Sequence, residues 1–165
     1  MVMLHTSDTG NRIMSAVVQD LQKRHPFLLP LSLSAVMIVL YLIPLVAMTV
    51  RGKGSGPGIW GLFSIIAILV TIAAPIVYGW QTRDAKGAVF IGVFPFLITM
   101  TVPRIVSGEL PRDTTQLVRT VIYIASLCTI SGLEGYFASR HEDKSLLAAL
   151  ALAGLWFIVF LSGLN

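Results

Sequence analysis

The chain of 165 residues is 55% hydrophobic and only 12% charged, whereas soluble domains carry roughly 25% charged residues. This composition excludes an ordinary soluble domain and predicts an all-α integral membrane protein, a helical bundle that crosses the bilayer several times. The net charge of +4 comes from Lys and Arg residues scattered at the ends of apolar runs, so a nucleic-acid partner is not expected.

Residues 1–26 precede the first apolar run and carry a helical pattern of their own. The residues on its apolar side are Ile13, Met14, Val17, Val18 and Leu21. This pattern predicts an amphipathic helix that lies in the membrane surface and ends before Pro26. A helix that binds a partner protein would have the same pattern. Residues 27–165 are then a single transmembrane domain.

Five segments approach the length of about 20 apolar residues that a helix needs to cross the membrane. The predicted spans are 27–50, 59–80, 87–106, 117–139 and 145–164. The third contains the shortest apolar run, so a re-entrant hairpin is the alternative for it. Five crossings place the two termini on opposite sides of the membrane, whereas four place them on the same side.

Three prolines fall inside the first three spans, at Pro44, Pro75 and Pro95. Each removes a backbone hydrogen bond and is expected to kink its helix. Kinked helices can shape a cavity or a gate in a transport protein. Prolines are also common in membrane helices that transport nothing, so both interpretations stay open.

The basic residues favour a cytoplasmic N-terminus and a C-terminus on the opposite side, because cytoplasmic loops carry an excess of Lys and Arg. In this orientation the cytoplasmic segments hold Arg12, Lys23, Arg24, Arg83, Lys86, Arg140 and Lys144. The opposite side holds Arg51, Lys53, Arg104, Arg112 and Arg119. The difference is small.

Similar residues recur in the two predicted cytoplasmic loops at a spacing of 58. The matching pairs are Tyr78 and Tyr136, Asp84 and Glu142, and Lys86 and Lys144. A duplicated two-helix unit would explain them. The simpler explanation is that both loops collect the aromatic and charged residues typical of a membrane interface.

Small residues mark the fourth and fifth spans. Gly132 and Gly135 lie in the fourth, and Ser145, Ala149 and Ala153 repeat every fourth residue in the fifth. Such stripes let helices approach closely in lipid. They predict helix packing, either between these two spans or against another subunit.

The sequence offers little catalytic chemistry within the membrane. No predicted span contains histidine or aspartate, and Cys128 is the only cysteine, so no cofactor and no metal ion are expected. One cluster could serve an enzyme that modifies lipids, with carboxylates to hold Mg²⁺ and arginines to bind phosphate. Its members are Asp84, Glu134, Glu142, Asp143, Arg83 and Arg140.

Glu134 is the most unusual residue in the chain. Between Thr120 and Leu133 there are 14 uncharged residues, about 21 Å of helix, which is too short to cross the hydrocarbon. The helix must therefore continue to about Ser139, and Glu134 lies in the bilayer roughly 7 Å from its cytoplasmic edge. Arg83 and Arg140 are its candidate charge partners, within one chain or between subunits.

Three functions follow as hypotheses. The first is a small, non-catalytic membrane subunit that packs, in the lipid bilayer, with other membrane proteins or with itself. The second is a channel or transporter, with a homo-oligomer as one form, with proline-kinked helices and Glu134 in a cytoplasmic vestibule. The third is the lipid-modifying enzyme, although the sequence favours a protein that is not an enzyme.

Overall fold

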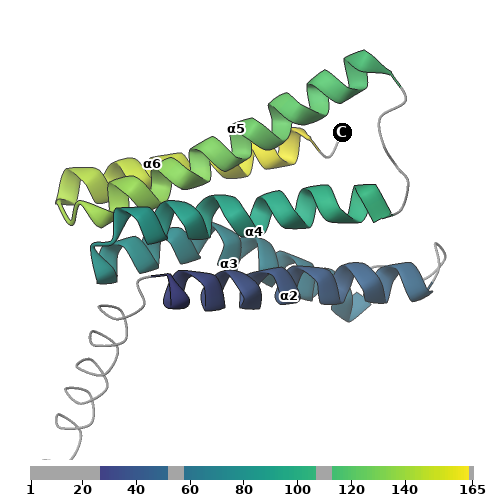
Figure 1. The fold of residues 1–165 in the computed structure, drawn as a ribbon, viewed down its shortest axis with the longest axis horizontal. Coiled ribbons are helices and arrows are strands. Elements are labelled where there is room, and N and C mark those ends of the chain that lie inside the picture. The colour runs from purple at the N-terminus through teal and green to yellow at the C-terminus, as the bar shows by residue number, and fades with distance from the viewer. Residues whose placement is uncertain (1–26, 52–57, 107–112, 164–165) are drawn as a thin grey trace, which may run out of the picture.

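The computed structural model describes residues 27–51, 58–106 and 113–163, which form five helices in one bundle (Figure 1). The helices are α2 (Leu28–Arg51), α3 (Gly58–Thr82), α4 (Ala85–Val106), α5 (Thr114–Ser139) and α6 (Asp143–Ser162). The predicted surface helix in residues 1–26 lies outside the described residues.

The predicted all-α membrane bundle is confirmed. The largest difference from a predicted helix end is at the start of α5, which begins at Thr114. Helices α3 to α6 are each long and apolar enough to cross a membrane, and α2 has a shorter apolar stretch, Leu28–Pro44. The alternative of a re-entrant hairpin is wrong, because α4 is one continuous helix of 22 residues.

Helices α2, α3 and α4 continue past Pro44, Pro75 and Pro95. All three prolines are buried inside the bundle, where neighbouring helices rather than lipid surround the weakened backbone. The kinks expected at these positions stay a prediction.

Helix α5 packs on α3 and α4 through glycines that bring the backbones together. A Cβ atom added to Gly135 would lie 2.7 Å from the carbonyl oxygen of Ala88, and one added to Gly79 would lie 2.7 Å from the carbonyl oxygen of Gly135. At Gly92 the added atom would lie 2.5 Å from the carbonyl oxygen of Ser131. The backbone of α5 therefore approaches α3 and α4 closely at Gly135.

The remaining small residues also serve contacts within the chain. A Cβ atom on Gly132 would lie 3.1 Å from Val93 Cγ2. Ser145 and Ala149 of α6 are buried, and Ala153 packs against the cluster of Ile76, Ala138 and Ala149. Within the described residues, the stripe on α6 thus faces its own bundle rather than a surface left for another subunit.

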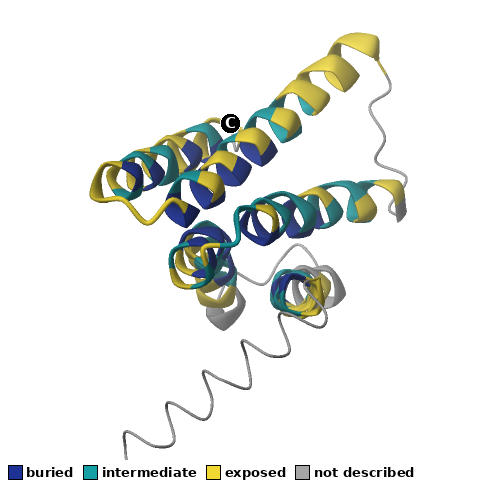
Figure 2. Cartoon of the chain, turned by 60° about the vertical axis from the view of Figure 1, so that its left-hand side comes forward, coloured by how far each residue is buried: buried dark blue, intermediate teal, exposed yellow. Residues whose placement is uncertain are grey.

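The outer surface of the bundle carries the large apolar side chains (Figure 2). Leu62, Leu69, Leu147 and Ile158 are all more than half exposed. This inside-out distribution is what a bilayer requires, because lipid tails solvate apolar side chains. The first two turns of α5 are also exposed, and α5 diverges there from α4 (Figures 1 and 2).

The hairpins α3–α4 and α5–α6 have corresponding turns at the same end of the bundle. Arg83 and His141 are the only described non-glycine residues with positive φ, and both have φ 56°. They stand 58 positions apart, which is the spacing of the sequence matches. The turns also touch, since the Trp80 and His141 rings stack with centroids 4.1 Å apart.

The correspondence extends into the helices. The segments 66-IAILVTI-72 of α3 and 124-IASLCTI-130 of α5 agree at five of seven positions at the same spacing. In both, the threonine hydroxyl donates to the carbonyl four residues earlier, Thr71 to Ala67 at 2.8 Å and Thr129 to Ala125 at 2.7 Å. Matching helices, turns and hydrogen bonds favour a duplicated hairpin over the simpler explanation.

Gly135→Ala is predicted to destabilise the protein by about 1–3 kcal/mol, because the new methyl group would overlap the backbone of α4. Gly154 is the matched control, since it lies in α6 with nothing within 4 Å of an added Cβ. Gly154→Ala should be neutral or stabilising by about 0.5 kcal/mol. Thermal unfolding in mild detergent measures both, and equal effects would contradict the proposed packing.

Candidate functional site

Glu134 lies on the inner face of α5 and is fully buried, with 0% of its surface exposed. It follows Ser131 by three residues and precedes Ala138 by four, so all three lie on one face of the helix. Both neighbours are also buried. Glu134 thus lies on a helix that is long and apolar enough to cross a membrane, and its side chain is enclosed by the bundle.

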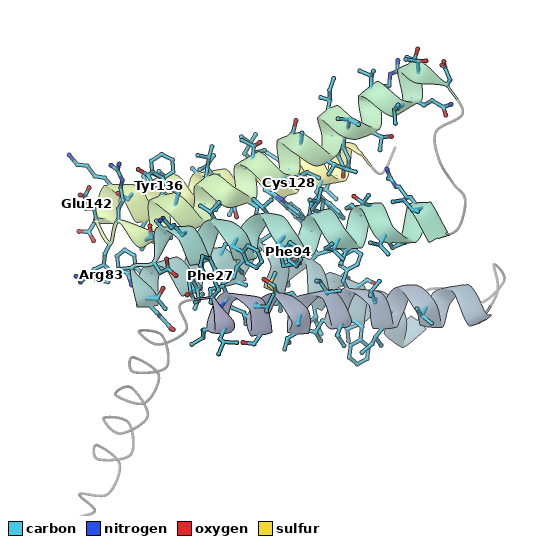
Figure 3. The ribbon with its side chains drawn as sticks, in the orientation of Figure 1. Phe27, Arg83, Phe94, Cys128, Tyr136 and Glu142 are labelled. Atoms are coloured by element: carbon cyan, nitrogen blue, oxygen red, sulfur yellow. The ribbon has the colours of Figure 1, made fainter. Side chains whose placement is uncertain are left out.

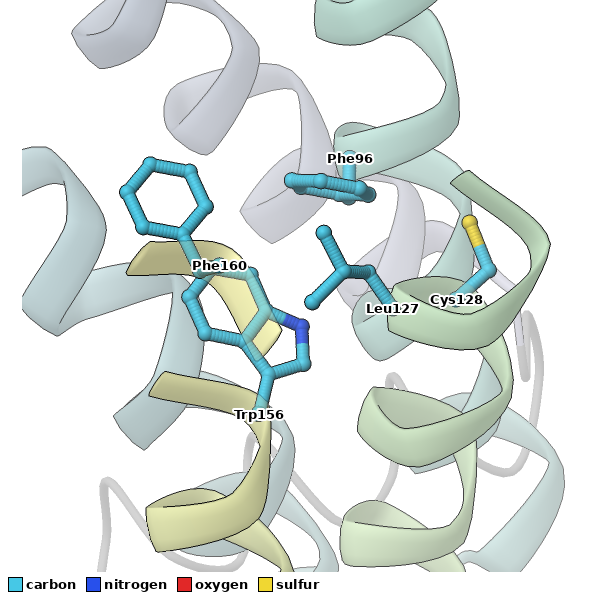
Figure 4. Close-up of a cluster of buried hydrophobic side chains, with 5 residues drawn as sticks. All are labelled: Phe96, Leu127, Cys128, Trp156 and Phe160. Atoms are coloured by element: carbon cyan, nitrogen blue, oxygen red, sulfur yellow. The ribbon is translucent and has the colours of Figure 1, made fainter. Parts of the chain in front are cut away.

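Two apolar clusters adjoin this position along α5. Leu127, two turns before Glu134, belongs to a cluster with Cys128, Phe96, Trp156 and Phe160 (Figure 4). In it the Trp156 ring stacks on Phe160 with centroids 5.1 Å apart and meets Phe96 edge-on at 5.5 Å.

One turn after Glu134, Ala138 packs with Ile76 of α3 and Ala149 of α6 in a second cluster. Along α5, Glu134 therefore lies between two apolar clusters to which α3, α4 and α6 contribute.

Neither carboxyl oxygen of Glu134 has a hydrogen-bond partner in the described part of the chain. The expected pairing with Arg83 or Arg140 within one chain is therefore wrong. Arg140 is exposed and its Nη2 donates to the Tyr136 hydroxyl at 2.7 Å. Arg83 is exposed in the turn between α3 and α4.

A second subunit cannot supply the missing partner while the bundle stays closed. Helices α3, α4 and α6 all pack against α5, and Glu134 exposes no surface to an outside molecule. Pairing between subunits would require these helices to separate.

Other buried polar groups of the bundle also lack hydrogen-bond partners among the described residues. The Ser131 hydroxyl, one turn away on the same face, has none, and neither has the Trp156 indole N–H in the adjoining cluster. In the sequence, the spacing of three residues within one helix is the signal that could have linked Ser131 to Glu134.

An ionised carboxylate without a partner is very unfavourable in such surroundings. Glu134 must therefore hold a proton, or contact a water molecule or ion that enters the bundle. In each case the protonation or the contacts of Glu134 change when a proton, a water molecule or an ion reaches it. That property is typical of functional acids within membranes.

The carboxylates that the lipid-modifying enzyme would need do not form a metal-binding cluster in the described part of the chain. Asp84 accepts hydrogen bonds from the Tyr78 hydroxyl at 3.0 Å and the Gly87 amide at 3.1 Å. Glu142 accepts one from Ser145 at 3.4 Å. Among the described residues, no three His, Cys, Asp or Glu side chains lie close enough to hold a metal ion.

Comparisons with protein-family models, with curated proteins and with solved structures find no match to this chain.

Glu134→Met is predicted to raise the stability of the protein by about 1–3 kcal/mol, because it replaces unpaired buried oxygens with an apolar side chain of similar length. The control is Glu142→Met, which removes an exposed carboxylate with a partner and should not stabilise. Thermal unfolding in detergent tests both. A large loss of stability in Glu134→Met would show that the carboxyl group has a structural partner.

Proposed function

We propose that this protein carries protons across the membrane and that Glu134 binds and releases the proton. The supporting observation is the fully buried carboxyl group with both oxygens unpaired. A purely structural acid would be expected to have a hydrogen-bond partner, because a half-satisfied polar group is worse than an apolar one.

The duplicated hairpin strengthens this argument. The position of Glu134 corresponds, at the spacing of 58, to Ile76 in the first hairpin. Ile76 is buried in the cluster that adjoins Glu134 along α5. An apolar side chain thus suits the packing at this position, and the acid in the second hairpin needs a different explanation.

A proton fits this position better than a metal cation. Metal cations such as Ca²⁺ and Mg²⁺ require about six oxygen ligands or retained water. Glu134 and Ser131 offer few oxygens, and apolar clusters adjoin them. A carboxylate that takes a proton becomes neutral without further ligands.

The backbone contacts around α5 suit a movement that would open the site. Gly79, Gly92 and Gly135 place smooth backbone surfaces against each other, and Pro75 on α3 weakens the helix one turn before Gly79. Small relative movements of such helices can expose a buried acid to one side and then the other. The end with Arg83, Lys86, Arg140 and Lys144 is proposed as the cytoplasmic side.

Glu134→Gln is predicted to abolish proton flux while leaving the fold intact, since the amide has the same shape but does not titrate. The measurement uses reconstituted vesicles that contain a pH-sensitive dye, with an imposed pH gradient and a clamped potential. Wild-type protein should equilibrate the dye faster than empty vesicles. Asp143→Asn, which removes an exposed acid at the start of α6, should behave like wild type.

Two results would contradict the proposal. One is a wild-type rate equal to that of empty vesicles. The other is an unchanged rate in Glu134→Gln.

A second proposal is a non-catalytic subunit of a membrane complex, and one observation favours it. Gly154 faces outward from α6 with nothing within 4 Å of an added Cβ, which would let a helix of another protein approach closely. Purification in mild detergent tests this proposal. Co-purification of other polypeptides at fixed stoichiometry would support it, and Gly154→Leu should then release them.

A further inference from the structure

Two apolar grooves run end to end along the outer face of α4. The first has a volume of about 680 Å³ and extends from Ala85 to Leu97, with Tyr136 of α5 on its side. The second, about 350 Å³, lies between α4 and α5 and reaches Arg104. The two share Val93 and Leu97 and meet there.

The length of the first groove matches one leaflet of a membrane. Its residues on α4 cover 12 positions after Ala85, about 18 Å of helix. Half of the hydrocarbon core is about 15 Å thick. The groove therefore extends from the membrane surface, at the end with the helix turns, to about the centre of the bilayer.

The wall of this groove is suited to an acyl chain. Phe90 and Phe94 line it, and their rings stack with centroids 4.8 Å apart. Figure 3 shows Phe94 on α4 and Tyr136 on α5 in the part of the bundle nearer the turns. Val89 and Val93 complete an apolar surface between these aromatic rings.

Positive charge is present at the outer end of the groove. Lys86 lines it there. Arg140 is held beside it, because its guanidinium donates to the Tyr136 hydroxyl at 2.7 Å and lies 5.1 Å from the centre of that ring. Glu142 is the acid whose charge acts on Arg140, and it also accepts a hydrogen bond from Ser145.

We propose that the groove over Phe90, Phe94 and Tyr136 binds an anionic phospholipid, with an acyl chain along α4 and the phosphate between Lys86 and Arg140. An apolar groove of one-leaflet length with cations at its outer end is complementary to such a lipid. Basic pockets between transmembrane helices bind anionic head groups in this way. A transmembrane helix of another protein would not need cations at that end.

The test titrates detergent-solubilised protein with dioleoyl phosphatidylglycerol or dioleoyl phosphatidylcholine and counts bound lipids by native mass spectrometry. Wild type should prefer phosphatidylglycerol by about tenfold or more. The double variant Lys86→Gln/Arg140→Gln should lose this preference. Arg83→Gln/Lys144→Gln removes the same charge at the same end of the bundle from residues that do not line the groove, and it should keep the preference.

Val89→Trp supplies the second test, because the larger side chain would fill the groove and should abolish binding of both lipids. Circular dichroism and unfolding temperature confirm the fold of each variant. The proposal is overturned if wild type does not discriminate between the two lipids, if Lys86→Gln/Arg140→Gln discriminates as wild type does, or if a co-purifying polypeptide must be removed before lipid binds. None of these readouts depends on proton flux.

Discussion

The contact of α5 with α3 and α4 through glycine backbones is the interaction on which the candidate site depends. Gly79, Gly92 and Gly135 remove the side chains that would hold the helices apart. Because α5 lies so close, the face that carries Glu134 is covered completely. A bulkier residue at any of these glycines would separate the helices and bring lipid or water to the carboxyl group.

The enclosure has an electrostatic consequence. In water or at a membrane surface an unpaired glutamate is stable in its ionised form, because water solvates its charge. Inside this bundle the apolar clusters around Leu127 and Ala138 adjoin it, and Arg83 and Arg140 lie in exposed turns. The same packing that stabilises the bundle thus makes the state of Glu134 sensitive to any proton, water or ion that enters.

A duplicated hairpin would explain how such a site arises within an ordinary bundle. In each hairpin, the residue at the corresponding turn position has a positive φ. A threonine hydroxyl in each also donates to the carbonyl four residues earlier. The copies differ at Ile76 and Glu134, which stand at corresponding positions. One hairpin retains an apolar residue for packing, and the other carries the acid on which the proposed function depends.

Helix positions followed from the sequence because length and apolarity decide what crosses a membrane. The position of Glu134 within the fourth helix followed from the same length argument, whereas close packing at Gly135 was expected from the stripe of small residues. The partners of Glu134 were not predicted, since an arginine a few positions away can point into solvent, as Arg140 does when it binds Tyr136. Side-chain direction across four helices depends on tertiary contacts that no single segment contains.

We propose that Glu134, which has no hydrogen-bond partner among the described residues, holds a proton while the bundle is closed. Infrared difference spectroscopy of wild type against Glu134→Gln tests it most directly, in lipid at neutral pH. A protonated-carboxyl C=O stretching band is expected in wild type and should be absent from Glu134→Gln. A difference spectrum with ionised-carboxylate bands alone would contradict it.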